Sequence, residues 1–286
     1  MMPLSRPSYL LRVNPETKKE ARRFSIALAG LAGLTAAFGV ACGKKEDPVA
    51  LAPSATALAS SQASASSVWH YAIDSTSRTH VDLPGLQERI QGDTSAAQGA
   101  VDVDGDDLSK SRGTVRVDLM TFTTSTFGND DDKTQTKHAR TWLEVQVGNR
   151  TNEAMRWADF AIRSIDGLSE TTLAKVAAER NGGEDLRKVA MTVHGDLLVH
   201  GHAAPKVGAV TVVFHYPAGA PAASRPARIE IDSASPFHVV LKEHDVRPRD
   251  PAGQILEWTA KLVAKVADTA DVTVHLTATP AGDGPP

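Results

Sequence analysis

Three closely spaced histidines are the first residues in this chain whose type suggests chemistry, because the imidazole is a common ligand for transition metals. They are His194, His200 and His202. On one strand, the side chains at 200 and 202 would point the same way, as two metal ligands require. However, Gly201 between them indicates a turn, and no neighbouring Glu or Cys completes a set of three or four ligands. The pattern therefore favours solvent-exposed hairpin histidines, and we predict no metal site.

A second group of candidate ligands is acidic. Residues 102–107 read Asp-Val-Asp-Gly-Asp-Asp, which is similar in composition to a calcium-binding loop. An EF-hand loop needs glycine at its sixth position and glutamate at its twelfth, whereas here glycine is fourth and Gly113 occupies the twelfth. We therefore predict an ordinary Asp-Gly hairpin turn. The acidic stretch Asn129–Asp132 is interpreted as an exposed loop.

The sequence offers no centre for covalent catalysis. It contains no Gly-x-Ser-x-Gly nucleophile motif, and its Ser, His and Asp residues show no spacing that singles out a triad. The pair Gly182-Gly183 does not join a strand to a helix as a phosphate-binding loop does. We predict a protein that is not an enzyme and needs no cofactor.

The sole cysteine, Cys42, stands at the end of a typical export signal. Basic residues between Arg12 and Arg23 precede an uncharged run, Phe24–Ala41, and small residues follow at Gly39-Val40-Ala41. This junction resembles the lipobox of bacterial lipoproteins, although Gly39 stands where leucine is usual. The resemblance implies that residues 1–41 are removed and that Cys42 is diacylated. The protein would then be exported and lipid-anchored on the periplasmic face of a bacterial membrane. The alternative is that Phe24–Ala41, about 18 residues long, remains as a short membrane anchor.

The charge of the chain argues against nucleic acid as a partner. The formal net charge is −3, and the segment before Cys42 carries six basic and only two acidic residues, so the rest is more acidic still. Phosphates require a basic surface. Residues 42–67 are rich in Ala, Ser and Pro and are interpreted as a flexible tether. Residues 280–286 are interpreted as a disordered tail, which leaves 68–279 as the folded domain.

Alternating apolar and polar residues dominate this domain, as expected for antiparallel strands that cover a core. Many short segments of this kind, separated by Gly, Pro and Asp turn signals, favour an all-β barrel or sandwich. The clearest are 115–121, 210–216, 229–231, 237–241 and 272–276. Two stretches have helical spacing: Ile255–Val266, and Ser169–Glu179, which would also suit a strand.

Four segments, in order, resemble the YceI family of periplasmic lipid-binding proteins. They are Trp69–Ser77, Gly99–Asp104, Val193–Gly201 and Pro236–Leu241, and the resemblance spans Trp69–Ala278. It implies an antiparallel, lipocalin-like β-barrel whose apolar tunnel holds a long-chain isoprenoid or other lipid. Lys137–Arg140 occupies the place of a family element that usually contains an acidic residue, which is missing here.

The side chains expected to face the tunnel are those on the apolar faces of the strands. A barrel of this size can equally be filled by its own side chains, so the competing interpretation is an envelope module that acts by protein contact. Trp142, Trp157 and Phe160 fit either a tunnel wall or a core. The predicted ligand-binding residues are Val117, Leu119, Phe160, Ile162, Leu197, Val199, Val212, Phe214, Val239 and Leu241.

Overall fold

The computed structural model describes residues 68–84, 89–256 and 267–282. The predicted signal segment, Cys42 and the tether lie outside the described residues, as does nearly all of the helix expected at 255–266. The described residues lie almost entirely within the domain expected at 68–279. None of their helices has the length and hydropathy needed to cross a membrane.

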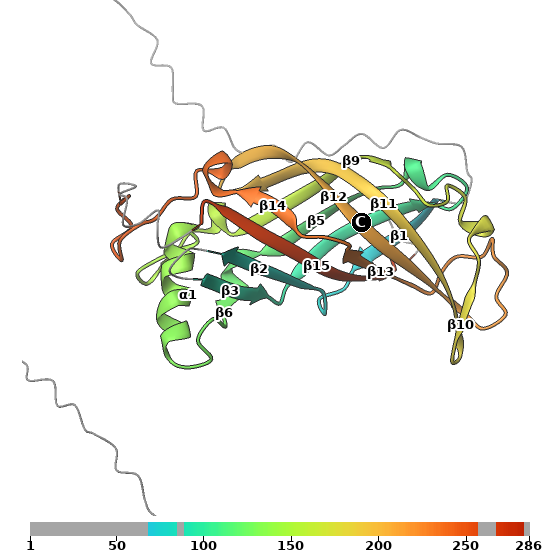
Figure 1. The fold of residues 1–286 in the computed structure, drawn as a ribbon, viewed down its shortest axis with the longest axis horizontal. Helices are drawn as coiled ribbons and strands as arrows, with labels where there is room; N and C mark the ends of the chain where they lie inside the picture. The colour runs from blue at the N-terminus through green and yellow to red at the C-terminus, as the bar shows by residue number, and fades with distance from the viewer. Residues whose placement is uncertain (1–67, 85–88, 257–266, 283–286) are drawn as a thin grey trace, which may run out of the picture. The chain divides into compact units, whose positions relative to one another are not determined.

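Strands make up most of this domain (Figure 1). Thirteen of those described belong to one sheet. They are β1 (Val68–Ile73), β2 (Arg78–Pro84), β3 (Arg89–Thr94), β4 (Ala97–Asp104), β5 (Arg112–Asp118), β6 (Thr123–Thr124), β9 (Trp157–Asp166), β10 (Glu179–Asn181), β11 (Glu184–Val199), β12 (His202–Pro217), β13 (Arg228–Ser233), β14 (Phe237–Val240) and β15 (Thr269–Pro280). The remaining two, β7 (Gln146–Val147) and β8 (Arg150–Thr151), form a separate hairpin next to α1 (Asp131–Trp142).

The large sheet closes into a ring because its last strand returns to its first. Along the ring the antiparallel order is β1, β4, β5, β9, β11, β12, β13 and β15, and β15 pairs again with β1. The strands β2 and β14 continue the lines of β1 and β13 along the two edges of β15. Closure removes the exposed edges that an open sheet would present.

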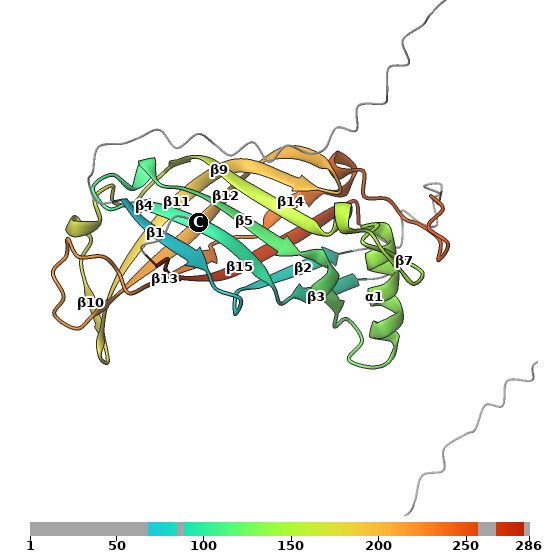
Figure 2. The ribbon, with the colours of Figure 1, turned by 180° about the vertical axis from the view of Figure 1, so that it is seen from behind.

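The ring is less complete at the end where α1 lies (Figures 1 and 2). There β14 pairs with β15, and β6 pairs with β3, but in the described part of the chain neither forms a ladder with the strand on its other side. The barrel is therefore closed by fewer ladders at this end, although Phe237 of β14 still packs over Gly208 of β12.

Helix α1 contradicts the loop expected at Asn129–Asp132. Asp131 and Asp132 form its first turn, where acidic side chains favour the positive end of the helix dipole. The Asp132 carboxylate also accepts hydrogen bonds from the backbone N–H groups of Phe127 and Gly128, at 3.0 and 2.8 Å. The sequence pattern missed the helix because its few apolar residues show no helical period.

Two other local expectations are corrected. The helix expected at Ser169–Glu179 is only a 3-10 turn, Leu173–Lys175, because the backbone N–H of Leu173 bonds to Gly105 O at 3.0 Å and ties this segment to the β4–β5 connection. That connection is itself longer than the expected Asp-Gly turn. It contains a second 3-10 turn, Leu108–Lys110, whose start is capped by the Asp107 side chain.

The packed core lies at the end of the barrel away from α1. Its largest buried side chains are Tyr71, Phe214, Tyr216 and Ile229, each at most 1% exposed. The hydroxyl of Tyr71 donates a hydrogen bond to the carbonyl of Pro226 at 2.8 Å. A smaller apolar cluster forms near α1, built on Leu83, Ile90, Val239 and Ala270.

Candidate functional site

An apolar cavity of about 300 Å³ occupies the barrel interior. This is at the lower end of the range for small-molecule sites, which runs from about 300 to 1,000 Å³. Its wall is almost entirely apolar and is built from inward-facing residues of the ring strands together with residues of α1. Several inward side chains near α1, such as Leu197 and Leu241, are only half-buried although they point away from bulk solvent. Their remaining accessible surface faces the cavity.

All ten side chains predicted to face the tunnel lie on the wall of this cavity. The period of two places eight of them there, because alternate residues of a strand share one face of the sheet. Leu119 and Leu241 reach the wall from the 3-10 turns Leu119–Thr121 and Leu241–His244, at which the strands expected to continue to 121 and 241 have already ended. Their contact with a ligand stays a prediction. Of the aromatic residues left open, Trp142 lines the cavity, whereas Trp157 stacks beneath the guanidinium groups of Arg116 and Arg156, at 4.7 and 5.1 Å.

Two phenylalanine rings lie where the cavity meets the core cluster, whose Phe214 also lines the cavity. Phe160 and Phe237 meet edge to face, with ring centroids 6.3 Å apart, and both line the cavity while packing against the core cluster. Each ring lies over an inward-facing glycine. A Cβ at Gly195 would come within 2.5 Å of the Phe160 ring, and a Cβ at Gly208 would collide with Phe237. The glycines thus make room for the two rings.

Helix α1 and the segment after β14 close the other side of the cavity. His138, Ala139 and Trp142 of α1 line it, as do His244 and Val246. The indole N–H of Trp142 donates to the carbonyl of Arg249 at 3.1 Å, which fixes the helix against that segment. Sequence reasoning missed most of these residues because they lie outside the alternating strands.

Polar groups on the wall are few, and two of them have no hydrogen-bond partner among the described residues. These are the hydroxyl of Thr79 and Nε2 of His244. His244 is fully buried, and its Nδ1 lies 2.9 Å from the carbonyl oxygen of His202, so Nδ1 is the donor and Nε2 an acceptor. Burial, the largest cause, lowers the pKa of His244, which favours the neutral imidazole.

Lys206 also reaches the wall, and its ammonium nitrogen pairs with Glu243 at 2.6 Å. The region around His244 therefore offers one hydrogen-bond acceptor and one paired cation, while the rest of the wall offers only van der Waals contact. This arrangement suits a mainly apolar molecule with a small polar group.

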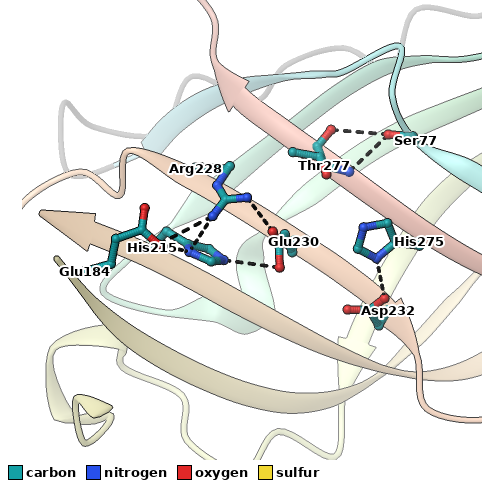
Figure 3. A network of polar contacts seen from close by, with 8 residues as sticks. All are labelled: Ser77, Glu184, His215, Arg228, Glu230, Asp232, His275 and Thr277. Atoms are coloured by element: carbon teal, nitrogen blue, oxygen red, sulfur yellow. Dashed lines mark hydrogen bonds and ion pairs between the residues drawn. The ribbon is translucent and has the colours of Figure 1, made fainter. Parts of the chain in front are cut away.

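A separate polar cluster lies around the packed end of the barrel (Figure 3). Nδ1 of the buried His215 is 2.9 Å from Glu184, and its Nε2 is 3.3 Å from Glu230. Arg228 pairs with both carboxylates. Among the described residues, no hydroxyl or thiol is paired with His215, so the cluster joins β11, β12 and β13 without forming a nucleophilic site. The nearby Ser77 bonds only to the backbone of Thr277.

A family model for the YceI-like domain matches residues 71–278. The chain belongs to the YceI-like domain family. The resemblance seen in the sequence is therefore confirmed, and the closed antiparallel ring of strands confirms the expected lipocalin-like barrel. No match was found among curated proteins.

Two solved structures are similar to this YceI-like protein. One is BcnA from Burkholderia cenocepacia, which is 17% identical, with a TM-score of 0.47 and coverage of 72% of this chain and 99% of that one. The other is a polyisoprenoid-binding domain from Saccharophagus degradans implicated in plant cell wall breakdown. It is 14% identical, with a TM-score of 0.46 and coverage of 74% of this chain and 98% of that one.

In this YceI-like domain, Lys137–Arg140, the element that lacks the usual acidic residue, lies on α1. His138 and Ala139 of this element line the cavity. Arg140 turns elsewhere, and its Nε donates to the carbonyl of Phe122 at 3.1 Å. The element therefore contributes to the cavity wall through its middle residues, while its arginine anchors the helix to the chain before β6.

Proposed function

We propose that this protein binds one long apolar chain, an isoprenoid or similar lipid tail, inside the barrel and performs no covalent chemistry on it. The observation that carries this proposal is the almost wholly apolar cavity inside the barrel. Each CH₂ group moved from water into such a space contributes about 0.8 kcal/mol, so a long chain is held without a charged anchor. The cavity favours this function over that of a filled barrel acting through protein contacts.

The polar end of the ligand lies next to His244 in this proposal. Nε2 of His244 has no partner among the described residues, and His244 is one of the residues that line the apolar cavity, so a ligand hydroxyl donating to Nε2 would satisfy a buried acceptor. Lys206 lies on the same wall with its ammonium group held by Glu243. A small hydroxyl-bearing head group fits this pair better than a fully apolar end does.

The protein is also proposed to act at the envelope, held to a bacterial membrane by lipid on Cys42. The support is the order of basic, apolar and small residues before this cysteine. Replacing the acceptor, Cys42→Ala, should abolish acylation and release the protein from membranes. If the variant stays with the membrane fraction after a carbonate wash, Phe24–Ala41 acts as a transmembrane anchor instead.

Mass spectrometry of lipid that co-purifies with the protein tests the ligand proposal. The matched pair of variants is Leu197→Trp and Leu198→Trp, because these neighbours on β11 point to opposite faces and only Leu197 lines the cavity. We expect Leu197→Trp to fold and to lose its lipid, and Leu198→Trp to keep it. A wild type without lipid, together with a strongly destabilised Leu197→Trp, would favour a filled barrel that acts by contact.

A further inference from the structure

Unusual backbone geometry is concentrated at one place outside the cavity. In the described part of the chain, three non-glycine residues have a positive φ: Glu144 at 53°, His200 at 52° and Asp245 at 51°. They come from three distant segments, namely the chain after α1, the β11–β12 turn and the chain after the 3-10 turn Leu241–His244. All three side chains nevertheless belong to one cluster. Left-handed backbone at non-glycine residues is held only where the surrounding structure enforces it, and such positions gather at functional sites.

His200 is the centre of the cluster, and one of its ring nitrogens is left without a partner. The side chain is 5% exposed, and its Nε2 lies 2.5 Å from Oε2 of Glu144. A carboxylate accepts, so Nε2 carries the hydrogen and Nδ1 presents a lone pair. No group in the described ranges donates a hydrogen bond to that Nδ1. A buried nitrogen with a free lone pair would be stabilised by a hydrogen-bond donor or by a metal ion.

Two further residues with ligand atoms lie next to His200. His200, His202 and Asp245 each offer one ligand atom, and these atoms all lie within 4.8 Å of one another. The rings of His200 and His202 are stacked, with centroids 6.2 Å apart. Arg247 pairs with Oδ1 of Asp245 at 2.5 Å. A carboxylate has two oxygens, so Asp245 can keep this pair and still coordinate with the other.

We propose that His200, His202 and Asp245 bind one divalent transition-metal ion, with zinc as the best chemical match. Two imidazoles and one carboxylate are a typical zinc donor set with three protein ligands, and water takes the fourth position. Bond lengths of about 2.0–2.2 Å place tetrahedral ligand atoms roughly 3.3 Å apart. The three side chains therefore need to close in by at most about 1.5 Å, which rotation of the exposed His202 can supply in part.

Glu144 completes the site as a positioning residue. A ligating histidine usually donates its other ring N–H to a carboxylate, which fixes the orientation of the ring and raises its basicity. Glu144 provides this group, and Arg249 holds Glu144 in turn, with its Nη2 3.1 Å from Oε2. The sequence expectation of exposed hairpin histidines is thus wrong for His200. Its carboxylate partner lies 56 residues away along the chain and could not be found by local spacing.

The site does not depend on the lipid proposal, because none of its three ligands lines the cavity. Its mechanical role is to fasten the β11–β12 turn to the chain at Asp245, directly after the 3-10 turn Leu241–His244. His244 ends that turn, and its Nδ1 hydrogen-bonds to the carbonyl of His202. A bound metal ion would therefore stabilise the wall at this end of the barrel.

Titration of the metal-stripped, purified protein with Zn²⁺ alone tests the proposal. Calorimetry should show one saturable ion per chain, and thermal unfolding should shift to higher temperature with Zn²⁺. His202→Ala and Asp245→Asn should each remove both effects; neither residue is buried, so both variants are expected to fold. The matched control is His194→Ala, because His194 lies on β11 outside the cluster and forms an exposed pair with Asp166 of β9 at 2.9 Å. This control should bind Zn²⁺ like the wild type.

Glu144→Gln separates positioning from simple support of the fold. It should keep the stability of the metal-free protein close to that of wild type and weaken Zn²⁺ binding by about 10- to 100-fold, the usual effect of losing such a partner. Substitution with Co²⁺ should give the strong visible absorption of a four-coordinate site in wild type. The absence of saturable Zn²⁺ binding, or equal affinity in His202→Ala and wild type, would overturn the proposal. Lipid content measured on the same samples reports separately on the proposed function.

Discussion

The two ends of the barrel are made from the same kinds of residue but are filled differently. Away from α1, Tyr71 and Tyr216 occupy the interior; each is at most 1% exposed and neither lines the cavity. Next to α1, inward apolar residues such as Leu197 and Leu241 remain half-buried on the cavity wall. The strand pairing also differs between the two ends, because β6 and β14 each form a ladder on one side only in the described structure.

A second comparison concerns two histidine–glutamate clusters, one around His215 and one around His200, two histidines that are both buried. His215 has a carboxylate near each ring nitrogen, at 2.9 and 3.3 Å, although of these two contacts only the one between Nδ1 and Glu184 is a hydrogen bond in the described structure. His200 has a carboxylate at one nitrogen and, among the described residues, no hydrogen-bond partner at the other. Similar residue types therefore give a histidine flanked by carboxylates on both sides at one place and an incomplete coordination set at the other. The groups that surround a buried ring nitrogen therefore carry more functional information than the residue type does.

The largest expected effect comes from removing a side chain at the packed end. Tyr216→Ala should lower the free energy of unfolding by about 3–5 kcal/mol, because Tyr216 is 1% exposed and does not line the cavity, so its loss leaves a new void in the packed core. Leu241→Ala at the α1 end should lower it by less than about 2 kcal/mol, since part of this side chain already faces open space. Denaturant unfolding of both variants measures the difference. Equal losses would mean that both ends are packed alike.

A smaller effect is expected at the boundary between the two ends. Val212 belongs to the packed core and also lines the cavity. Val212→Trp should lower the unfolding free energy by about 1–3 kcal/mol through overpacking and should also reduce bound lipid. Val213→Trp places the same volume on the opposite face of β12 and serves as its control. If Val212→Trp keeps its lipid, the chain lies nearer α1 than this boundary.

The positions of eight of the ten tunnel-facing residues were predictable because strand alternation fixes a face whatever the neighbouring strand is. Val212 and Phe214 of β12, for example, both line the cavity although β12 pairs with strands on either side. The pattern does not tell whether facing side chains meet across the barrel. This depends on where ladders begin and end, and Gly195 and Gly208 show that it also depends on which rings find room.

The helix and the metal cluster escaped prediction for a different reason. α1 has few apolar residues and owes its place to single contacts, such as the bond from Trp142 to the carbonyl of Arg249. Glu144, His200 and Asp245 meet only because the barrel brings three distant connections together. The spacing of residues along the chain does not indicate such long-range contacts. Sequence reasoning therefore predicts which face of a strand a side chain lies on, but not which loops come together.

The smallest expected effect concerns the His215 cluster and tests whether the charge of Glu184 in that cluster stabilises the fold. The hydrogen bond to His215 is the largest cause that lowers the pKa of Glu184 below its ordinary value of 4.5, and Arg228 adds to it. A carboxyl group with a lowered folded-state pKa stabilises the fold above its unfolded pKa, and this contribution disappears as pH falls through the folded value. Glu184→Gln should therefore be less stable than wild type at pH 7, and the difference should shrink as pH falls below about 4.5.

Thermal unfolding of wild type and Glu184→Gln from pH 7 to pH 3 measures this convergence. Glu179→Gln is the control, because Glu179 forms only a surface pair with Lys188, at 3.2 Å, and such pairs contribute little. Zn²⁺ binding should be the same in both variants as in wild type, since neither position belongs to the His200 cluster. If the difference in unfolding temperature between wild type and Glu184→Gln stays constant down to pH 3, the charge of the Glu184 carboxylate does not stabilise the His215 cluster. The two clusters would then differ only in how their carboxylates are placed, with one beside each ring nitrogen of His215 and one beside Nε2 of His200.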